Sequence, residues 1–254
     1  MHCVITAGGL AAPDEPMYAL TQGKPKALLA MNGRTMLERV VDALQGSRAI
    51  DEIVVVGLGS DMGMHFARPV AHVPDHGSLA GNIIAGADWL REHHPDETVF
   101  VFCSADIPTL TAAIVDAFVD GCRPFDQGIY YSIVTREVME ARFPHSHRTF
   151  TKLKGGLEFA GGDLHIIRLD ALRDNYELLN TLTNVRKHAW KIARVAGLRL
   201  IVRLLLRQLT IPEMEAEAKR IAGFTAKIVL SQHAELGMDA DKPGQVELLR
   251  KEFM

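Results

Sequence analysis

The stretch Cys3-Val4-Ile5-Thr6-Ala7-Gly8-Gly9 places a short β-favouring run directly before a pair of glycines. Similar β-rich runs follow at Ile53–Val56 and Thr98–Cys103, and helical patterns lie between them at Thr35–Leu44 and Leu79–Leu90. Strands that alternate with helices of this length indicate βαβ units and a mainly parallel sheet. Fully apolar strands indicate a sheet covered on both faces. We therefore predict a three-layer α/β/α fold with a Rossmann-like sheet.

The same first half of the chain contains a further short strand at Val70–Val73 and a further helix at Thr109–Val119. After residue 122 the pattern becomes rich in β-strands, and we predict strands at Gly128–Val134, Arg148–Leu153 and Leu164–Leu169. Glycine pairs are strong turn signals. We therefore expect turns at two such pairs, Gly155-Gly156 and Gly161-Gly162.

The last third of the chain is predicted to be helical from Asp170 to Ala222, with Pro212 in the first turn of a new helix. A strand at Phe224–Leu230 and a short helix at Gly244–Phe253 follow. No linker rich in Pro, Ser or Gly separates these parts. We therefore expect one domain over 1–254, made of a first half (1–122), a β-rich insertion (123–182), a helical excursion (183–222) and a closing strand and helix (223–254).

Composition excludes several classes of protein. Lys and Arg number 28 against 31 Asp and Glu, a net charge of −3, which excludes a broadly basic nucleic-acid-binding protein. With 48% hydrophobic and 23% charged residues, the 254-residue chain is not typical of disorder. The three cysteines are far apart and form no CxxC, so we expect no disulfide framework and a reducing compartment. No leader pattern and no uncharged span of ~20 residues is present, and we predict a cytoplasmic protein without a transmembrane segment.

Two features near the first strand could hold phosphate. A glycine pair at the carboxyl end of a parallel strand lets backbone N–H groups approach a ligand closely. Gly8 and Gly9 stand at that position, although an ordinary strand-end turn is equally compatible with them. Lys26 follows Pro25 and offers a fixed positive charge. The competing interpretation of Lys26 is a solvated surface lysine.

Two further features carry carboxylates. Asp106 comes directly after the strand at Thr98–Cys103, where an open α/β sheet binds ligands. Asp239 and Asp241 lie two residues apart shortly before Pro243. Hard oxygen ligands of this kind hold Mg²⁺ beside phosphates. The alternatives are local: Asp106 could cap the next helix, and Asp241 could cap the helix that begins at Pro243.

The order of these four motifs resembles the nucleotidyltransferases of GT-A type, the fold of nucleotide-diphospho-sugar transferases. Within them the chain is similar to the MobA-like NTP transferases, the branch that includes molybdenum-cofactor guanylyltransferase and the cytidylyltransferase of isoprenoid precursor synthesis. The resemblance runs from Cys3 to about Cys122 and resumes near Gly237–Leu249. It implies Mg²⁺-dependent transfer of a nucleotide from an NTP to a small phosphorylated acceptor, with release of pyrophosphate.

The resemblance also implies roles for particular residues. Lys26 and Asp106 would be catalytic, and Asp106 would hold Mg²⁺ with Asp241 or Asp239. The residues implied to contact the nucleotide are Ala7, Gly8, Gly9, Lys26, Ser78, Gly81, Asn82 and Asp106. In the resembling enzymes the β insertion binds the acceptor, so the candidates there are Arg148, Lys152, Gly161, Gly162 and Asp163. A solvated strand face is the alternative for Arg148 and Lys152.

The loop after Gly9 departs from the pattern of the resembling enzymes. Their loop usually continues to an Arg that helps to bind phosphates, whereas this loop carries Asp14 and Glu15, with Lys24 as a substitute cation. Two other functions therefore stay open: a non-catalytic nucleotide-binding protein, and a GT-A glycosyltransferase that uses the Asp239-x-Asp241 pair for a nucleotide-sugar metal. The position of that pair near the end of the chain argues against the glycosyltransferase.

Three other patterns are given no role in the predicted reaction. Gly57-x-Gly59 continues to Gly63 with a spacing one residue too long for a dinucleotide fingerprint. The histidines at 93, 94, 145 and 147 lack metal-ligand spacing and are predicted to lie on the surface. Asn184–Gln208 is basic and apolar, and we predict a helix packed on the core or in a homodimer; an interfacial membrane helix is the alternative.

Overall fold

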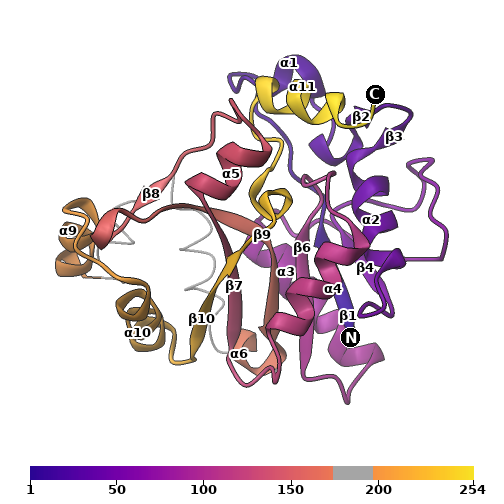
Figure 1. The fold of residues 1–254 in the computed structure, drawn as a ribbon. Coiled ribbons are helices and arrows are strands. Elements are labelled where there is room, and N and C mark those ends of the chain that lie inside the picture. The colour runs from indigo at the N-terminus through magenta and orange to yellow at the C-terminus, as the bar shows by residue number, and fades with distance from the viewer. Residues whose placement is uncertain (174–196) are drawn as a thin grey trace.

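The structure is a computed structural model that describes residues 1–173 and 197–254. A mixed, mostly parallel sheet with helices on both faces forms its centre (Figure 1). The prediction of a three-layer α/β/α fold is confirmed. The strands of the sheet are β1 (His2–Thr6), β4 (Ile53–Val56), β5 (Ala71–Val73), β6 (Val99–Ser104), β7 (Ile129–Thr135), β8 (Thr151–Lys152), β9 (Glu158–Arg168) and β10 (Ala226–Ser231). A separate small ribbon pairs β2 (Ala30–Met31) with β3 (Arg34–Thr35).

The strand order is β10-β7-β9-β6-β1-β4-β5, and β8 pairs with β9 at one side. β1 runs parallel to both β4 and β6, and β5 runs parallel to β4. β9 is antiparallel to both of its neighbours, β6 and β7. The carboxyl ends of β1, β4 and β6 therefore meet at one edge of the sheet, where open α/β sheets bind ligands.

Helices cover both faces of the sheet. On one face α2 (Met36–Gly46) and α4 (Ala112–Gly121) pack against side chains such as Ile5 and Val101. On the other face α3 (Leu79–His93) and α6 (Leu169–Arg173) pack against Val4 and Phe100. Successive residues of β1 and β6 thus point into two different cores, as the alternation of side chains along a strand requires.

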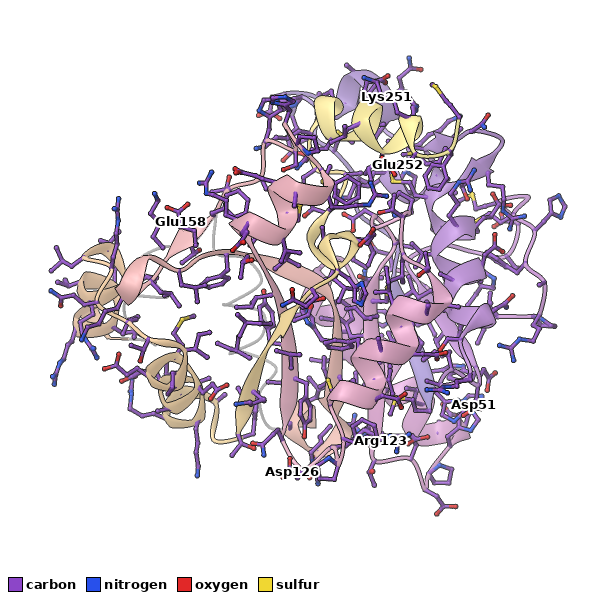
Figure 2. All side chains as sticks on the ribbon, in the orientation of Figure 1. Asp51, Arg123, Asp126, Glu158, Lys251 and Glu252 are labelled. Carbon is purple, nitrogen blue, oxygen red and sulfur yellow. The ribbon has the colours of Figure 1, made fainter. Side chains whose placement is uncertain are left out.

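The two ends of the chain lie at opposite ends of the sheet. Residue 1 lies near the amino end of β1, and α11 (Pro243–Lys251) lies near its carboxyl end (Figure 1). Figure 2 shows Asp51 toward the first of these ends and Lys251 and Glu252 at the other. The remaining short elements are α1 (Tyr18–Thr21), η1 (Lys26–Leu28), α5 (Arg136–Arg142), η2 (Lys154–Gly156), α9 (Leu198–Leu205), α10 (Ile211–Ala222) and η4 (Ala234–Gly237).

The β-rich middle differs from its prediction. Gly161 and Gly162 form no turn but lie inside the continuous strand β9. A Cβ atom at Gly161 would approach the Tyr131 hydroxyl to 2.6 Å, and one at Gly162 would approach the Ser132 Oγ atom to 2.1 Å. The side chains of β7 thus require glycine here for close packing rather than for a turn. The turn at Gly155-Gly156 is confirmed, with positive φ at both residues.

Several predicted elements have different bounds, and the strand predicted at Leu164–Leu169 is part of the longer strand β9. The strand predicted at Arg148–Leu153 is reduced to β8, and α4 begins three residues later than predicted. Thr111 is the N-cap of α4, because its hydroxyl accepts a hydrogen bond from the backbone N–H of Ile114. Residues 105–111 therefore connect β6 to α4 at the carboxyl edge of the sheet.

The predicted helical excursion lies partly outside the described residues, which omit 174–196. Its described part contains the helices α9 and α10, and Pro212 lies in the first turn of α10 as predicted. The division of the chain at residues 122, 182 and 222 and the homodimer stay predictions. Among the described residues no helix is long and apolar enough to span a membrane.

Candidate active site

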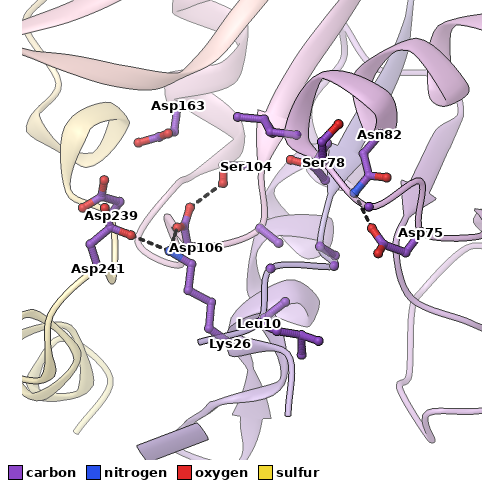
Figure 3. Close-up of a pocket in the computed structure, with 18 residues that line it drawn as sticks. Leu10, Lys26, Asp75, Ser78, Asn82, Ser104, Asp106, Asp163, Asp239 and Asp241 are labelled. Carbon is purple, nitrogen blue, oxygen red and sulfur yellow. Dashed lines mark hydrogen bonds and ion pairs between the residues drawn. The ribbon is translucent and has the colours of Figure 1, made fainter. Parts of the chain in front are cut away.

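A cavity of about 510 Å³ opens at the carboxyl ends of β1 and β6. Figure 3 shows that its walls come from separate parts of the chain: Asp75 and Asn82 lie on one side, Asp163 and Asp239 lie on the other, and Lys26 reaches between them. The predicted site residues that line this cavity are Ala7, Gly8, Gly9, Lys26, Ser78, Asn82, Asp106, Asp163, Asp239 and Asp241.

The glycine loop after β1 is shaped by a close contact between two backbones. Gly57 has a φ of 98°, and a Cβ atom there would approach the backbone nitrogen of Gly8 to 2.5 Å. Only glycine fits this combination of positive φ and close approach. At Gly9, by contrast, a Cβ atom would meet nothing within 4 Å. The backbone of the loop therefore lies open toward the cavity.

Lys26 is held next to the glycine loop by the backbone. Its N–H donates to the Gly9 carbonyl at 3.2 Å, and Leu10 and Pro25 form an isolated β-bridge. The short helix η1 begins at Lys26 directly after Pro25, which cannot donate a hydrogen bond. Backbone pairing between the two segments therefore explains why Lys26 lies beside the glycine pair.

The Lys26 ammonium bridges two carboxylates that are far apart in the sequence. It forms ion pairs with Asp106 and, at 2.6 Å, with Asp241. Burial by itself lowers the pKa of Lys26, but the two carboxylates outweigh burial and raise that pKa above its ordinary value. Burial likewise opposes ionisation of Asp106, yet Lys26 and the hydrogen bond from Ser104 hold the pKa of Asp106 below its ordinary value. Both groups are therefore charged at neutral pH.

Neither Asp106 nor Asp241 caps the helix that follows it, so the capping alternative is wrong for both. Asp106 accepts a 2.5 Å hydrogen bond from the Ser104 hydroxyl, while Thr111 caps the following helix. The N-cap of α11 is Lys242, so Asp241 does not cap that helix either. The backbone carbonyl of Asp106 accepts from the Ala240 N–H at 3.1 Å, which fixes the segment Asp239–Asp241 beside the end of β6.

The opposite wall of the cavity is acidic. Burial raises the pKa of Asp163 well above its ordinary value, and the nearby Asp239 and Asp106 carboxylates add to that effect. Burial also raises the pKa of Asp239 to about 6, although Arg148 partly opposes this. Five aspartates line the cavity, and among the described residues their ion-pair partners are only two cations, Lys26 and Arg148. A divalent cation would balance the remaining negative charge, and carboxylate oxygens are the ligands that Mg²⁺ prefers.

The segment from Gly77 to Asn82 has mostly structural contacts. Ser78 caps α3 by accepting a hydrogen bond from Gly81, and a Cβ atom at Gly81 would approach the His76 carbonyl oxygen to 2.9 Å. The buried Asn82 amide accepts from the His76 N–H and donates to Asp75 at 2.8 Å. Gly81 does not line the cavity, and Asn82 orients the Asp75 side chain at its rim.

The residues predicted to bind the acceptor lie in different places in the structure. Arg148 forms an ion pair with Asp239 and donates to the Gly161 carbonyl at 3.4 Å, so it supports the cavity from behind. Lys152 forms an ion pair with Glu158 and does not line the cavity. Arg148 and Lys152 therefore do not share a strand face, because the strand that would align them is present only at Thr151–Lys152. Gly161 and Gly162 are inside β9, and only Asp163 of this group lines the cavity.

Some lining residues were not predicted. Ser104 is the last residue of β6 and Asp75 lies two residues after β5, so both stand at the carboxyl ends of strands, the position that identified Asp106. Leu10 lines the cavity with 63% of its surface exposed. The dinucleotide interpretation of Gly57–Gly63 fails because no helix begins in that segment.

The histidine predictions are confirmed for three of four residues. His93, His145 and His147 are exposed, and the His93 ring stacks on Trp89 with 4.0 Å between ring centroids. His94 differs: it is half-buried and forms an ion pair with Glu52 at 2.7 Å beside His2. The sequence gives no signal for this cluster, because its members are distant along the chain.

Comparison with known proteins supports the resemblance. The family model of the MobA-like NTP transferase domain matches residues 3–173. A hypothetical transferase from Thermus thermophilus is 32% identical, with a TM-score of 0.80, over 97% of this chain and 100% of its own.

Two more distant structures share the fold. A nucleotidyl transferase from Methanothermobacter has 16% identity and a TM-score of 0.55 over 99% of this chain and 96% of its own. A CMP:2-keto-3-deoxy-manno-octonic acid synthetase in complex with CTP has 14% identity and a TM-score of 0.54 over 99% of this chain and 97% of its own. The family match covers well over half of the sequence, and the chain therefore belongs to the MobA-like NTP transferase family of nucleotidyltransferases.

Proposed function

We propose that the cavity transfers a nucleotide from an NTP to a small phosphorylated acceptor and releases pyrophosphate, with Mg²⁺ as cofactor. The observation that carries this proposal is the Lys26 ammonium between Asp106 and Asp241, beside an open glycine loop. Such a site brings together a cation, two carboxylates that could hold a metal, and the backbone of the glycine loop. These are the groups that phosphoryl transfer requires.

The donor nucleotide would bind along the glycine loop, with its triphosphate toward Lys26. Mg²⁺ would be held by Asp106 and Asp241, with Asp239 as a further ligand, and would neutralise charge on the phosphate oxygens. Lys26 would then turn from the carboxylates to the phosphates. An acceptor phosphate oxygen attacks the α-phosphorus, and the bond to the pyrophosphate oxygen breaks. The chain contributes positioning and charge neutralisation without a covalent intermediate.

The acceptor would approach from the wall formed by Asp163 and Asp239. This wall lies across the cavity from Asp75 and Asn82 (Figure 3). Asn82 and Ser78 would therefore lie on the nucleotide side, where Asn82 acts through Asp75 rather than by free amide groups. Arg148 would position Asp239, and Lys152 has no role in this arrangement.

Thermal denaturation with each of ATP, GTP, CTP and UTP, with and without Mg²⁺, tests the donor half of the proposal. Ligand at ~100 times its dissociation constant stabilises a protein by ~2.7 kcal/mol. We expect a Mg²⁺-dependent shift with one NTP, which identifies the base. Pyrophosphate release with that NTP and a set of phosphorylated acceptors then tests the transfer. The absence of a shift with all four NTPs would contradict the proposal.

A non-catalytic nucleotide-binding protein is the second candidate. The observation that favours it is the loop after Gly9, where Glu15 accepts a hydrogen bond from the Ala12 N–H in place of a phosphate-binding Arg. This candidate would be favoured if the protein binds a nucleotide but releases no pyrophosphate with any of the acceptors. Release of UDP from a UDP-sugar would instead indicate a glycosyltransferase.

A further inference from the structure

Four side chains that offer metal ligands meet at the amino end of the sheet, away from the cavity. His2 is the first residue of β1, Glu52 precedes β4, and His94 follows α3. Glu97 lies in the loop that leads to β6. Because β4, β1 and β6 are neighbours in the sheet, their amino ends bring these residues together. Asp51, next to Glu52, marks this region in Figure 2.

The distances suit a single ion. His2, Glu52 and His94 each offer one ligand atom, and these atoms lie within 4.8 Å of one another. Glu52 lies 2.7 Å from Nε2 of His94, and Glu97 lies 3.5 Å from Nε2 of His2. The two imidazole rings stack with 3.8 Å between their centroids. Binding of one ion would bring these donor atoms to the ~2.0–2.2 Å typical of Zn²⁺.

We propose that His2, Glu52 and His94 form a second metal site, which takes a borderline divalent cation of the Zn²⁺ type and has Glu97 as an additional carboxylate. Two imidazoles with carboxylates are typical ligands of Zn²⁺, whereas Mg²⁺ prefers oxygen ligands alone. The site is therefore chemically distinct from the aspartates of the cavity. It does not depend on the proposed nucleotidyl transfer.

The state of His2 is favourable for a ligand. Among the described residues, its buried Nδ1 atom has no hydrogen-bond partner. In a neutral imidazole, a ring nitrogen without a hydrogen-bond partner can offer its lone pair to a metal. Metal ligands must be deprotonated in this way before they bind.

The main chain around the site is firmly held. The N-terminal ammonium donates to Asp51 at 2.6 Å and to the Ala49 carbonyl at 3.1 Å, and the Cys3 N–H donates to the Glu52 carbonyl at 2.9 Å. These contacts fix the backbone of His2 beside that of Glu52. A bound ion would link the beginnings of β1 and β4 to the end of α3 and so stabilise the sheet at the edge opposite the cavity.

Zinc titration of the metal-free full-length protein by calorimetry tests the proposal, with Co²⁺ absorption as a second readout of nitrogen ligands. The variants are His94→Ala and Glu52→Gln. The matched control is His93→Ala, which removes the adjacent histidine but none of the proposed ligands. Asp106→Asn is titrated in parallel, because the cavity aspartates could also take Zn²⁺.

We expect one Zn²⁺ site that persists in His93→Ala and in Asp106→Asn. Its affinity should fall at least about tenfold in His94→Ala and in Glu52→Gln, since the loss even of a group that only orients a ligand costs ~10–100-fold. Zn²⁺ should also raise the melting temperature of the parent protein but not of His94→Ala. Equal Zn²⁺ affinity in the parent and His94→Ala, or loss of the site in Asp106→Asn alone, would overturn the proposal. Circular dichroism of the metal-free variants shows that each is folded.

Discussion

Lys26 and Arg148 are two cations that contact the same acidic cluster from different sides. Lys26 lines the cavity, bridges Asp106 and Asp241, and has 25% of its side chain exposed. Arg148 does not line the cavity; it contacts Asp239 and the Gly161 carbonyl with 13% of its side chain exposed. The two cations therefore differ in their position relative to the cavity. We therefore propose that Lys26 exchanges its carboxylates for phosphates, and that Arg148 mainly stabilises the fold.

The largest effect is expected at the carboxylate that Lys26 and the proposed Mg²⁺ share. Asp106→Ala should remove Mg²⁺-dependent NTP binding and lower the rate of pyrophosphate release by ~10²–10³-fold, the loss typical of one transition-state contact. Stability should change little, because Lys26 keeps its 2.6 Å contact with Asp241. Isothermal titration with NTP and thermal melting measure the two quantities. A collapse of the melting temperature with nucleotide binding intact would make Asp106 a structural residue.

The next effect concerns the Lys26 charge itself. Lys26→Ala should weaken binding of the triphosphate more than binding of the bare nucleoside, because only the triphosphate carries charge for the ammonium to neutralise. Titration of both ligands against the variant and the parent gives the ratio of the two losses. Lys26→Arg is the control for charge, since it keeps the cation and changes its shape. If Lys26→Ala weakens both ligands equally, Lys26 has no phosphate role.

The sequence predicts the structure near Lys26 better than the structure near Arg148. Ile53–Val56 and its neighbours are buried parallel strands, whose unbroken apolar runs identify them and place Gly8, Gly9 and Asp106 at one edge. The pairing of Lys26 with Asp241 spans 215 residues, and no local pattern indicates it. Here the resemblance to a family supplied what spacing could not.

The turn predicted at Gly161-Gly162 was wrong for a physical reason. The glycines of β9 look like turn residues in the sequence, but they are small because Tyr131 and Ser132 of β7 occupy the space beside them. Cross-strand packing of this kind depends on the register of β7 and β9, which a single sequence does not show. Arg148 contacts Asp239, and its role as an acceptor ligand stays a prediction.

Arg148 should therefore affect stability more than binding. Arg148→Ala leaves the buried Asp239 carboxylate without this partner, and breaking a buried pair costs ~3–5 kcal/mol. Denaturant unfolding of the variant gives the loss directly. Nucleotide affinity, measured where the variant is still folded, should fall less than in Lys26→Ala. If Arg148→Ala lowers the free energy of nucleotide binding more than the free energy of unfolding, Arg148 is a ligand-binding residue.

The smallest effect is expected at Lys152, which the sequence paired with Arg148. Lys152 contacts Glu158, and Glu158 keeps a second partner in Arg136 when Lys152 is removed. Exposed pairs of this kind contribute ~0–1 kcal/mol, so Lys152→Ala should change the unfolding free energy by no more than that. Its nucleotide affinity and pyrophosphate release should equal those of the parent protein. A clear loss of activity in Lys152→Ala with unchanged stability would mean that the acceptor reaches β8, and that the acceptor side of the site extends well beyond Asp163 and Asp239.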